Sequence, residues 1–297
     1  MKRLLSCSAS DFAMMTPQEL KTAIFASAGR SVMSETVAAC EPLVRGLTNA
    51  EAAAAFGADL ILLNFYDVLH PAVQGLPGAP ANPIAALKRL VGRPVGINLE
   101  PVGGGPALEE IVALPPGRCA TAESFAAAQA QGVDYICLTG NPGTGVTNAA
   151  VEAAVRLCRE RFQGLIIAGK MHGAGIDEEV LDTGAFVRFI EAGADIVLIP
   201  APGTVPGVSE RDAAAAVRAI HGNGALALSA IGTSQESADP ATVREIALAG
   251  KRAGADIQHI GDAGPCGMAD PENILALSVA IRGKRHTAFR MAGSVLR

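Results

Sequence analysis

The sequence predicts an α/β fold, a (β/α)8 TIM barrel with an N-terminal capping helix, in which residues 1–297 form one domain. A Gly-(Ala/Val)-Asp pattern followed by an apolar run occurs four times, starting at Gly57, Gly132, Gly193 and Gly254. These glycines lie 75, 61 and 61 residues apart (132−57, 193−132 and 254−193), which leaves room for one more strand between neighbouring repeats. Apolar runs that alternate with helical stretches indicate parallel strands covered by helices, and this chain length suits one such barrel.

The elements can be placed in chain order. Thr16, Pro17 and Glu19 are typical of a helix start, so we expect an amphipathic helix over about 17–28 that closes the bottom of the barrel. Strand 1 follows at 31–35, and each repeated glycine ends a helix in the left-handed conformation. The other strands are expected at 60–63, 94–100, 135–138, 165–172, 196–199, 225–231 and 257–260.

Composition excludes several classes of protein. Hydrophobic residues make up 49% and charged residues 18% of the chain, which excludes disorder. The net charge is −5 and no Lys/Arg run precedes the last helix, so we expect no nucleic-acid partner. No apolar run approaches the roughly 18 residues that span a bilayer, so we expect no membrane partner. The six cysteines are scattered without metal-binding spacing, which favours reduced thiols and a cytoplasmic protein.

Polar residues gather where strands are expected to end, which is where such barrels carry out their chemistry. Lys170 and His172 are two residues apart on one expected strand, so they are predicted to share a face. Alignment of the repeats and alternation along the other strands predict six further polar side chains facing the barrel: Asn64, Asn98, Glu100, Thr139, Ser229 and His259.

Glu100, Lys170 and His172 are the predicted catalytic residues. Lys170 is either a Schiff-base nucleophile activated by desolvation or a ligand for a substrate carboxylate or phosphate. His172 is a candidate for moving a proton, because imidazole titrates near neutral pH. A buried structural ion pair between Glu100 and Lys170 is the alternative.

A metal site is predicted from three carboxylates at neighbouring strand ends, Glu35, Asp67 and Glu100. Mg²⁺ or another divalent cation favours such oxygen ligands. For Asp67 the alternative is helix capping or hydrogen bonding within its loop. For His259 the alternative to a place in the substrate site is a hydrogen-bonded histidine in the core.

Three glycine-rich loops predict an anion site. The loop with Asn141, Gly143 and Gly145 leads into a helix, whose N-terminus attracts anions. Gly232 and Thr233, and Gly261 and Asp262, follow strands 7 and 8, where barrels often hold phosphate. Together they predict a small anionic metabolite, although glycine also suits any tight turn. No loop carries a Walker or dinucleotide fingerprint, so no nucleotide cofactor is expected. The segment 103–105 is a candidate lid.

Two resemblances accompany these patterns. The repeated Gly-Ala-Asp strands, with Gly232-Thr233-Ser234 and 261–264, resemble the broad class of phosphate-binding barrels. The opening 8–12, with Ser34-Glu35 and 64–67, resembles an uncharacterised bacterial barrel family that carries phosphoenolpyruvate mutase-like labels. The mutase and isocitrate lyase group has an Asp-rich strand-end motif and a Lys-Lys/Arg-Cys-Gly-His motif, and neither occurs here. The resemblance therefore implies only enolate-type chemistry.

These residues predict a lyase or isomerase acting next to a carbonyl in a small phosphorylated or carboxylate metabolite, by aldolase-like or enolate-type chemistry. Metal-assisted hydrolysis by the same carboxylates is one alternative. A non-catalytic barrel that serves in binding or assembly is another. The basic end of the last helix, 282–286, predicts a homo-oligomer.

Overall fold

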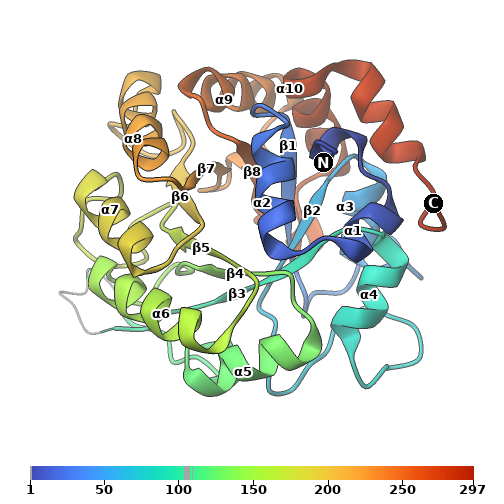
Figure 1. The fold of residues 1–297 in the computed structure, drawn as a ribbon, viewed down its shortest axis with the longest axis horizontal. Coiled ribbons are helices and arrows are strands. Elements are labelled where there is room, and N and C mark those ends of the chain that lie inside the picture. Colours follow the sequence, from blue (N-terminus) through green and yellow to red (C-terminus); the bar gives the residue numbers. More distant parts are fainter. Residues whose placement is uncertain (1, 104–107, 109) are drawn as a thin grey trace.

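The computed structural model describes residues 2–103, 108 and 110–297, and within them eight parallel strands close into a barrel. The strands pair in chain order, and β1 pairs with β8 to complete the ring. Their bounds are β1 Ser31–Val37, β2 Leu60–Asn64, β3 Val95–Leu99, β4 Tyr135–Leu138, β5 Leu165–Gly169, β6 Ile196–Pro200, β7 Leu226–Ile231 and β8 Ile257–Ile260. The predicted barrel is confirmed, with helices following one another around the strands (Figure 1).

Helices precede β1 and follow the strands around the outside of the barrel. The α-helices are α1 Ala9–Met14, α2 Pro17–Phe25, α3 Asn49–Ala55, α4 Pro83–Val91, α5 Ala122–Gln131, α6 Asn148–Arg161, α7 Thr183–Ala192, α8 Glu210–Gly222, α9 Pro240–Ala253 and α10 Pro271–Ala292. The short 3-10 turns are η1 Leu4–Ser6, η2 Pro116–Arg118, η3 Gln235–Ser237 and η4 Pro265–Gly267. The four repeated glycines end their helices at positive φ, between +75° and +119°, as predicted.

α2 is the predicted capping helix, and it ends three residues earlier than expected. It begins at Thr16, whose hydroxyl accepts the N–H of Glu19, with Pro17 in the first turn. Leu20 and Ile24 on its buried face pack with side chains of the barrel interior. The bottom of the barrel is therefore closed by apolar contact.

The repeated aspartate joins each even-numbered strand to the strand before it. Oδ2 of Asp59 accepts the backbone N–H of Val32 at 2.8 Å. The equivalent contacts are Asp134 with Val95 at 2.8 Å, Asp195 with Ile166 at 3.1 Å and Asp256 with Ala227 at 2.9 Å. This bond explains why the sequence repeats every two strands, since only the even strand supplies the carboxylate.

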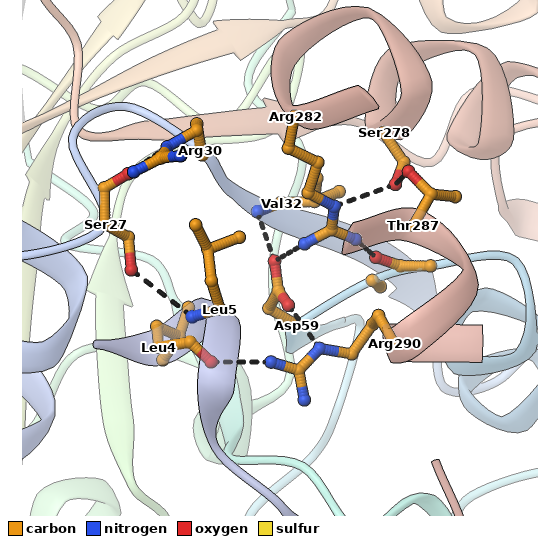
Figure 2. A network of polar contacts seen from close by, with 12 residues as sticks. Leu4, Leu5, Ser27, Arg30, Val32, Asp59, Ser278, Arg282, Thr287 and Arg290 are labelled. Atoms are coloured by element: carbon orange, nitrogen blue, oxygen red, sulfur yellow. Dashed lines mark hydrogen bonds and ion pairs between the residues drawn. The ribbon is translucent and has the colours of Figure 1, made fainter. Parts of the chain in front are cut away.

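Asp59 is also the centre of a buried charged cluster, which we call the arginine clasp: Asp59, Arg93, Arg282 and Arg290. Figure 2 shows Asp59 between Arg282 and Arg290. Arg282 Nη1 lies 2.5 Å and Arg290 Nε 2.6 Å from the carboxylate. Arg290 also donates to the carbonyls of Leu4 and Cys7, and Arg93 to the carbonyl of Arg290. The clasp therefore ties the N-terminal turn, the start of β2 and α10 together.

Arg282 of the basic segment 282–286 is thus buried within the chain, as is Arg290 further along α10, which removes part of the basis for an intermolecular contact. Lys284 and Arg285 remain exposed, and the homo-oligomer stays a prediction.

No helix among the described residues is long and apolar enough to cross a membrane. Gly104 and Gly105 of the candidate lid lie outside the described residues.

β5 ends at Gly169, three residues before the expected end. Gly169 has a φ of +151°, and a Cβ there would lie 2.1 Å from the carbonyl oxygen of Leu198 in β6. The chain therefore turns at a point where a side chain cannot fit. This turn decides where Lys170 and His172 lie.

Candidate active site

A pocket of about 130 Å³ opens at the C-terminal end of the barrel. Nine of the predicted site residues line it: Glu35, Asn64, Asn98, Thr139, Asn141, His172, Thr233, Gly261 and Asp262. They come from β1, β2 and β3 and from the loops after β4, β5, β7 and β8. Barrel interiors are usually filled by layers of branched apolar side chains, so this polar layer marks a site.

Strand alternation places the polar side chains above an apolar floor. Met33 and Leu62 belong to the cluster of interior side chains, and Glu35 and Asn64 continue the same faces two residues later. Asn98 lies on the inward face of β3, since Ile97 and Leu99 pack against the outer helices. The predicted inward positions of Asn64, Asn98, Thr139 and His259 are confirmed.

Asn64 is the centre of a hydrogen-bond network at the pocket wall. Its Nδ2 donates to Oδ1 of Asn141 at 2.8 Å and to Oδ2 of Asp262 at 2.9 Å. Its Oδ1 accepts from Nδ2 of Asn98 at 3.1 Å. The network fixes side chains from four strands or strand ends relative to one another.

Several buried polar atoms at this site make no hydrogen bond within the described part of the chain. They are Oδ1 of Asn98, Oγ1 of Thr139, Oε2 of Glu236 and both ring nitrogens of His259. Nε2 of His259 lies 3.2 Å from Oε2 of Glu35, close but without hydrogen-bond geometry. Buried polar groups are normally paired, so these atoms are candidates for hydrogen bonds to a ligand or to ordered water.

Burial shifts the acid–base groups in opposite directions. It raises the pKa of Glu35 to about 8, and the charges of Glu236 and Glu100 add to that shift. Burial raises the pKa of Asp262 to about 7 and holds the pKa of Glu236 above its usual value. It lowers the pKa of His259 to about 4. At neutral pH the site therefore combines a protonated carboxyl group with a neutral imidazole.

Glu236 was not predicted from the sequence. It lies in η3, two residues after the Gly232-Thr233-Ser234 segment, and is 2% exposed. Its Oε1 accepts the backbone N–H of Ala263 at 3.1 Å, which joins the loops after β7 and β8. A glutamate just past a predicted phosphate loop was the available signal.

Lys170 does not face the barrel, and the predicted shared face with His172 is wrong. It continues the outward series of Ile166 and Ala168, while the backbone turns after Gly169. Its Nζ pairs with Oε2 of Glu178 at 2.6 Å, and the same oxygen accepts the N–H of Asn148 at the start of α6. Lys170 therefore anchors the loop after β5.

Glu100 faces inward but does not line the pocket, and its partner is not Lys170. Oε1 accepts from Arg118 at 2.6 Å and Oε2 from the backbone N–H of Asn141 at 2.9 Å. The predicted ion pair between Glu100 and Lys170 is therefore wrong. Glu100 holds the loop that carries Asn141 in place.

The predicted inward position of Ser229 is also wrong. Leu228 and Ala230 of β7 pack in the barrel interior, so Ser229 faces outward. A Cβ on Gly250 of α9 would lie 2.6 Å from its Oγ, which shows how closely that helix approaches. Strand 7 has small apolar residues on both faces, so composition could not reveal which face was buried in the barrel.

Three predicted loop glycines do not line the pocket. Gly143 and Gly145 form backbone hydrogen bonds with Val112 and Ala174, at 2.8 and 3.0 Å. Gly232 makes room for Met171, since a Cβ there would lie 2.6 Å from the Met171 sulfur. These glycines shape the loops, and the predicted contribution of their N–H groups to this pocket is wrong.

The predicted metal set of Glu35, Asp67 and Glu100 does not assemble. Oδ1 of Asp67 accepts the N–H groups of Leu69 and His70 at 2.9 and 3.0 Å, which confirms the loop-capping alternative. No three His, Cys, Asp or Glu side chains converge on a metal position in the described part of the chain.

Mg²⁺ is held in many proteins by only one or two carboxylates, with water completing the shell. The pocket offers Glu236, Asp262 and the unpaired oxygen of Asn98. These are oxygen donors, the ligand type that Mg²⁺ prefers.

The rim of the pocket carries strained backbone. Thr233 and Ser234 have φ of +56° and +72°, in the region that favours glycine. Oγ1 of Thr233 donates to the carbonyl of Thr204 at 2.5 Å. Such strain is concentrated at functional sites. His172 also lines the pocket, and its Nδ1 accepts the N–H of Ala174 at 3.0 Å, which places the proton of a neutral ring on Nε2.

Residues 5–297 match a protein family described as a domain of unknown function (DUF7916). The chain belongs to this family. No curated protein matches its sequence. Membership in the DUF7916 family assigns no activity to this barrel. Its chemistry is therefore inferred from the residues of the pocket.

Solved structures share the fold of the DUF7916 barrel. A 2,3-dimethylmalate lyase of the PEP mutase/isocitrate lyase superfamily is 15% identical over 83% of this chain and 81% of that chain, with a TM-score of 0.51. Oxaloacetate acetylhydrolase is 17% identical over 82% and 80%, with a TM-score of 0.47. Thiamine phosphate pyrophosphorylase from Pyrococcus furiosus is 12% identical over 86% and 98%, with a TM-score of 0.47. At 15% identity, the similarity to the 2,3-dimethylmalate lyase shows the barrel fold alone.

Proposed function

We propose that this barrel is an enzyme, a lyase or isomerase that acts next to a carbonyl group of a small carboxylate metabolite. The observation that carries the proposal is the pocket lined by Glu35, Glu236 and Asp262, with the buried imidazole of His259 3.2 Å from Glu35 and several buried polar atoms without a hydrogen-bond partner. Making or breaking a bond next to a carbonyl requires a proton to be moved. A solved lyase with this fold supports the proposal at the level of architecture.

The roles follow from position. Glu35 lines the pocket and holds a proton at neutral pH, so it is the group that delivers and takes back the proton, with Nε2 of His259 3.2 Å from its Oε2. Asn98 and Thr139 each have a buried atom available for a substrate oxygen. Lys170 and Glu100 act on the surrounding loops instead, through Glu178 and Arg118.

The charge of the pocket also bears on its ligand. Among the described residues, its lining includes three carboxyl groups but no lysine or arginine. A carboxylate substrate therefore needs a positive partner, and a divalent cation held by Glu236 and Asp262 would supply it and polarise a carbonyl. The expectation of a phosphorylated substrate is weakened, because phosphate would need still more positive charge.

The test is thermal unfolding with pyruvate, oxalate and glycerol phosphate, with and without Mg²⁺. Binding at 100 times Kd stabilises the native state by about 2.7 kcal/mol. We expect a Mg²⁺-dependent rise in Tm with the carboxylates that is lost in Asp262→Asn and kept in Lys170→Met. Loss in Lys170→Met alone, or a borohydride-trapped adduct on Lys170, would overturn these roles. No rise with any ligand would favour the non-catalytic barrel.

A further inference from the structure

A second and larger cavity adjoins the pocket. It measures about 950 Å³ and lies among the loops after β5 and β6 and the start of α8. His172 and Thr233 line both cavities, so the two meet at these side chains. We call this cavity the side groove.

The side groove differs from the pocket in chemistry. Six apolar side chains line it: Val180, Leu181, Val205, Pro206, Val208 and Ala215. Its charged residues, Glu179 and Asp212, are both acidic, and no lysine or arginine lines it in the part of the chain that the structure describes. An anionic extension such as a phosphate or nucleotide would therefore be repelled, whereas an uncharged aliphatic chain would bury apolar surface.

The two sizes are complementary. At about 30 Å³ per water molecule, the pocket of about 130 Å³ has room for about four waters. The side groove lies within the range of about 300–1,000 Å³ that is typical of sites for larger ligands. Thr233, which bonds to the carbonyl of Thr204, holds the loops after β6 and β7 together where the cavities join.

We propose that the substrate has two parts, a small carboxylate head in the pocket and an uncharged aliphatic chain in the side groove. The placement of the carboxylate in the pocket rests on the proposed function, whereas the placement of the aliphatic chain in the side groove does not. Short-chain analogues would leave the apolar groove empty, and phosphorylated analogues would be repelled by the acidic residues of both cavities. The substrate class is thus an aliphatic oxo or hydroxy acid.

The experiment measures affinity along two series by calorimetry in the presence of Mg²⁺. One series is straight-chain 2-oxo acids from pyruvate to 2-oxodecanoate, and the other is primary alcohols of the same chain lengths. Burial of each methylene corresponds to at most about a fourfold gain in affinity. We expect a gain of about two- to fourfold per carbon until the groove is filled. Ala215→Trp fills the groove and should abolish the gain, whereas Arg218→Trp, exposed on the same helix but outside the groove, should preserve it.

The outcomes separate the two proposals. Pyruvate that binds with no gain for longer acids overturns the groove and leaves the proposed function standing. Alcohols that show the gain, lost in Ala215→Trp, while no oxo acid binds, support the groove and overturn the carboxylate head. Absence of binding in both series overturns both.

Discussion

Replacing Asp59 by asparagine should strongly destabilise the fold without altering the pocket. The side chain keeps its size but loses the charge that faces Arg282 and Arg290 at 2.5 and 2.6 Å. All three side chains are buried, and removing one partner of a buried ion pair typically costs about 3–5 kcal/mol. We therefore expect the free energy of unfolding to fall by about that amount, a large part of the roughly 5–15 kcal/mol typical of a domain.

The matched control is Asp256→Asn, at the equivalent position of another repeat. Asp256 also accepts a strand N–H, but its side-chain partner is His221, whose side chain is 35% exposed. A partly exposed pair contributes little, so we expect a loss of about 1 kcal/mol. Urea unfolding of both variants at pH 7 measures the difference. Equal losses in the two variants would refute the reasoning about buried charge.

The same pair of proteins tests the sign of the pH dependence. Burial alone would raise the pKa of Asp59, but the guanidinium groups of Arg282 and Arg290 reverse this and hold its pKa below the usual value. An acid with a depressed folded-state pKa stabilises the fold above its unfolded pKa and loses that stabilisation as the pH falls. The difference in the free energy of unfolding between wild type and Asp59→Asn should therefore become smaller as the pH is lowered. A gap that widened toward low pH would contradict the assignment.

Three further predictions test the site. Burial raises the pKa of Glu35 to about 8 from a reference of 4.5, so between pH 5 and 9 the wild type should lose stability relative to Glu35→Gln. Urea unfolding should show a relative loss of at most about 5 kcal/mol in the free energy of unfolding. If the free energies of the two proteins change in parallel with pH, the pKa of Glu35 is not raised. Thr139→Val removes a hydroxyl without a partner, so unfolding should change by less than about 1 kcal/mol while calorimetric affinity for pyruvate falls; unchanged affinity would remove Thr139 from the site. Ser229→Ala should leave both pyruvate affinity and Tm nearly unchanged, since its buried hydroxyl faces α9; a loss of affinity would return Ser229 to the pocket.

The barrel and much of its polar layer were predictable because both follow from periodicity. The repeated segments fix a common register, so Asn64, Thr139 and His259 could be assigned to the interior from their spacing alone. Two-residue alternation similarly placed Asn98 correctly. Periodicity thus located side chains wherever the strand remained regular.

The errors occurred where local geometry interrupts that regularity. β5 ends at Gly169, where the neighbouring strand β6 leaves no space for a Cβ, so the strand alternation does not extend to His172. Glu178 and Arg118, the true partners of Lys170 and Glu100, come from loops whose path depends on tertiary contacts. Glu236 reaches the pocket through a short turn, and no periodic pattern extends into such a turn.

The arginine clasp has a consequence for the order in which the protein is made. Arg282 and Arg290 lie 223 and 231 residues after Asp59 (282−59 and 290−59). A nascent chain that emerges from the ribosome with its N-terminus first must keep Asp59 hydrated until α10 has been synthesised. We therefore expect the first strands to remain loosely assembled during translation, with closure of β1 onto β8 and burial of Asp59 completed together after α10 is released.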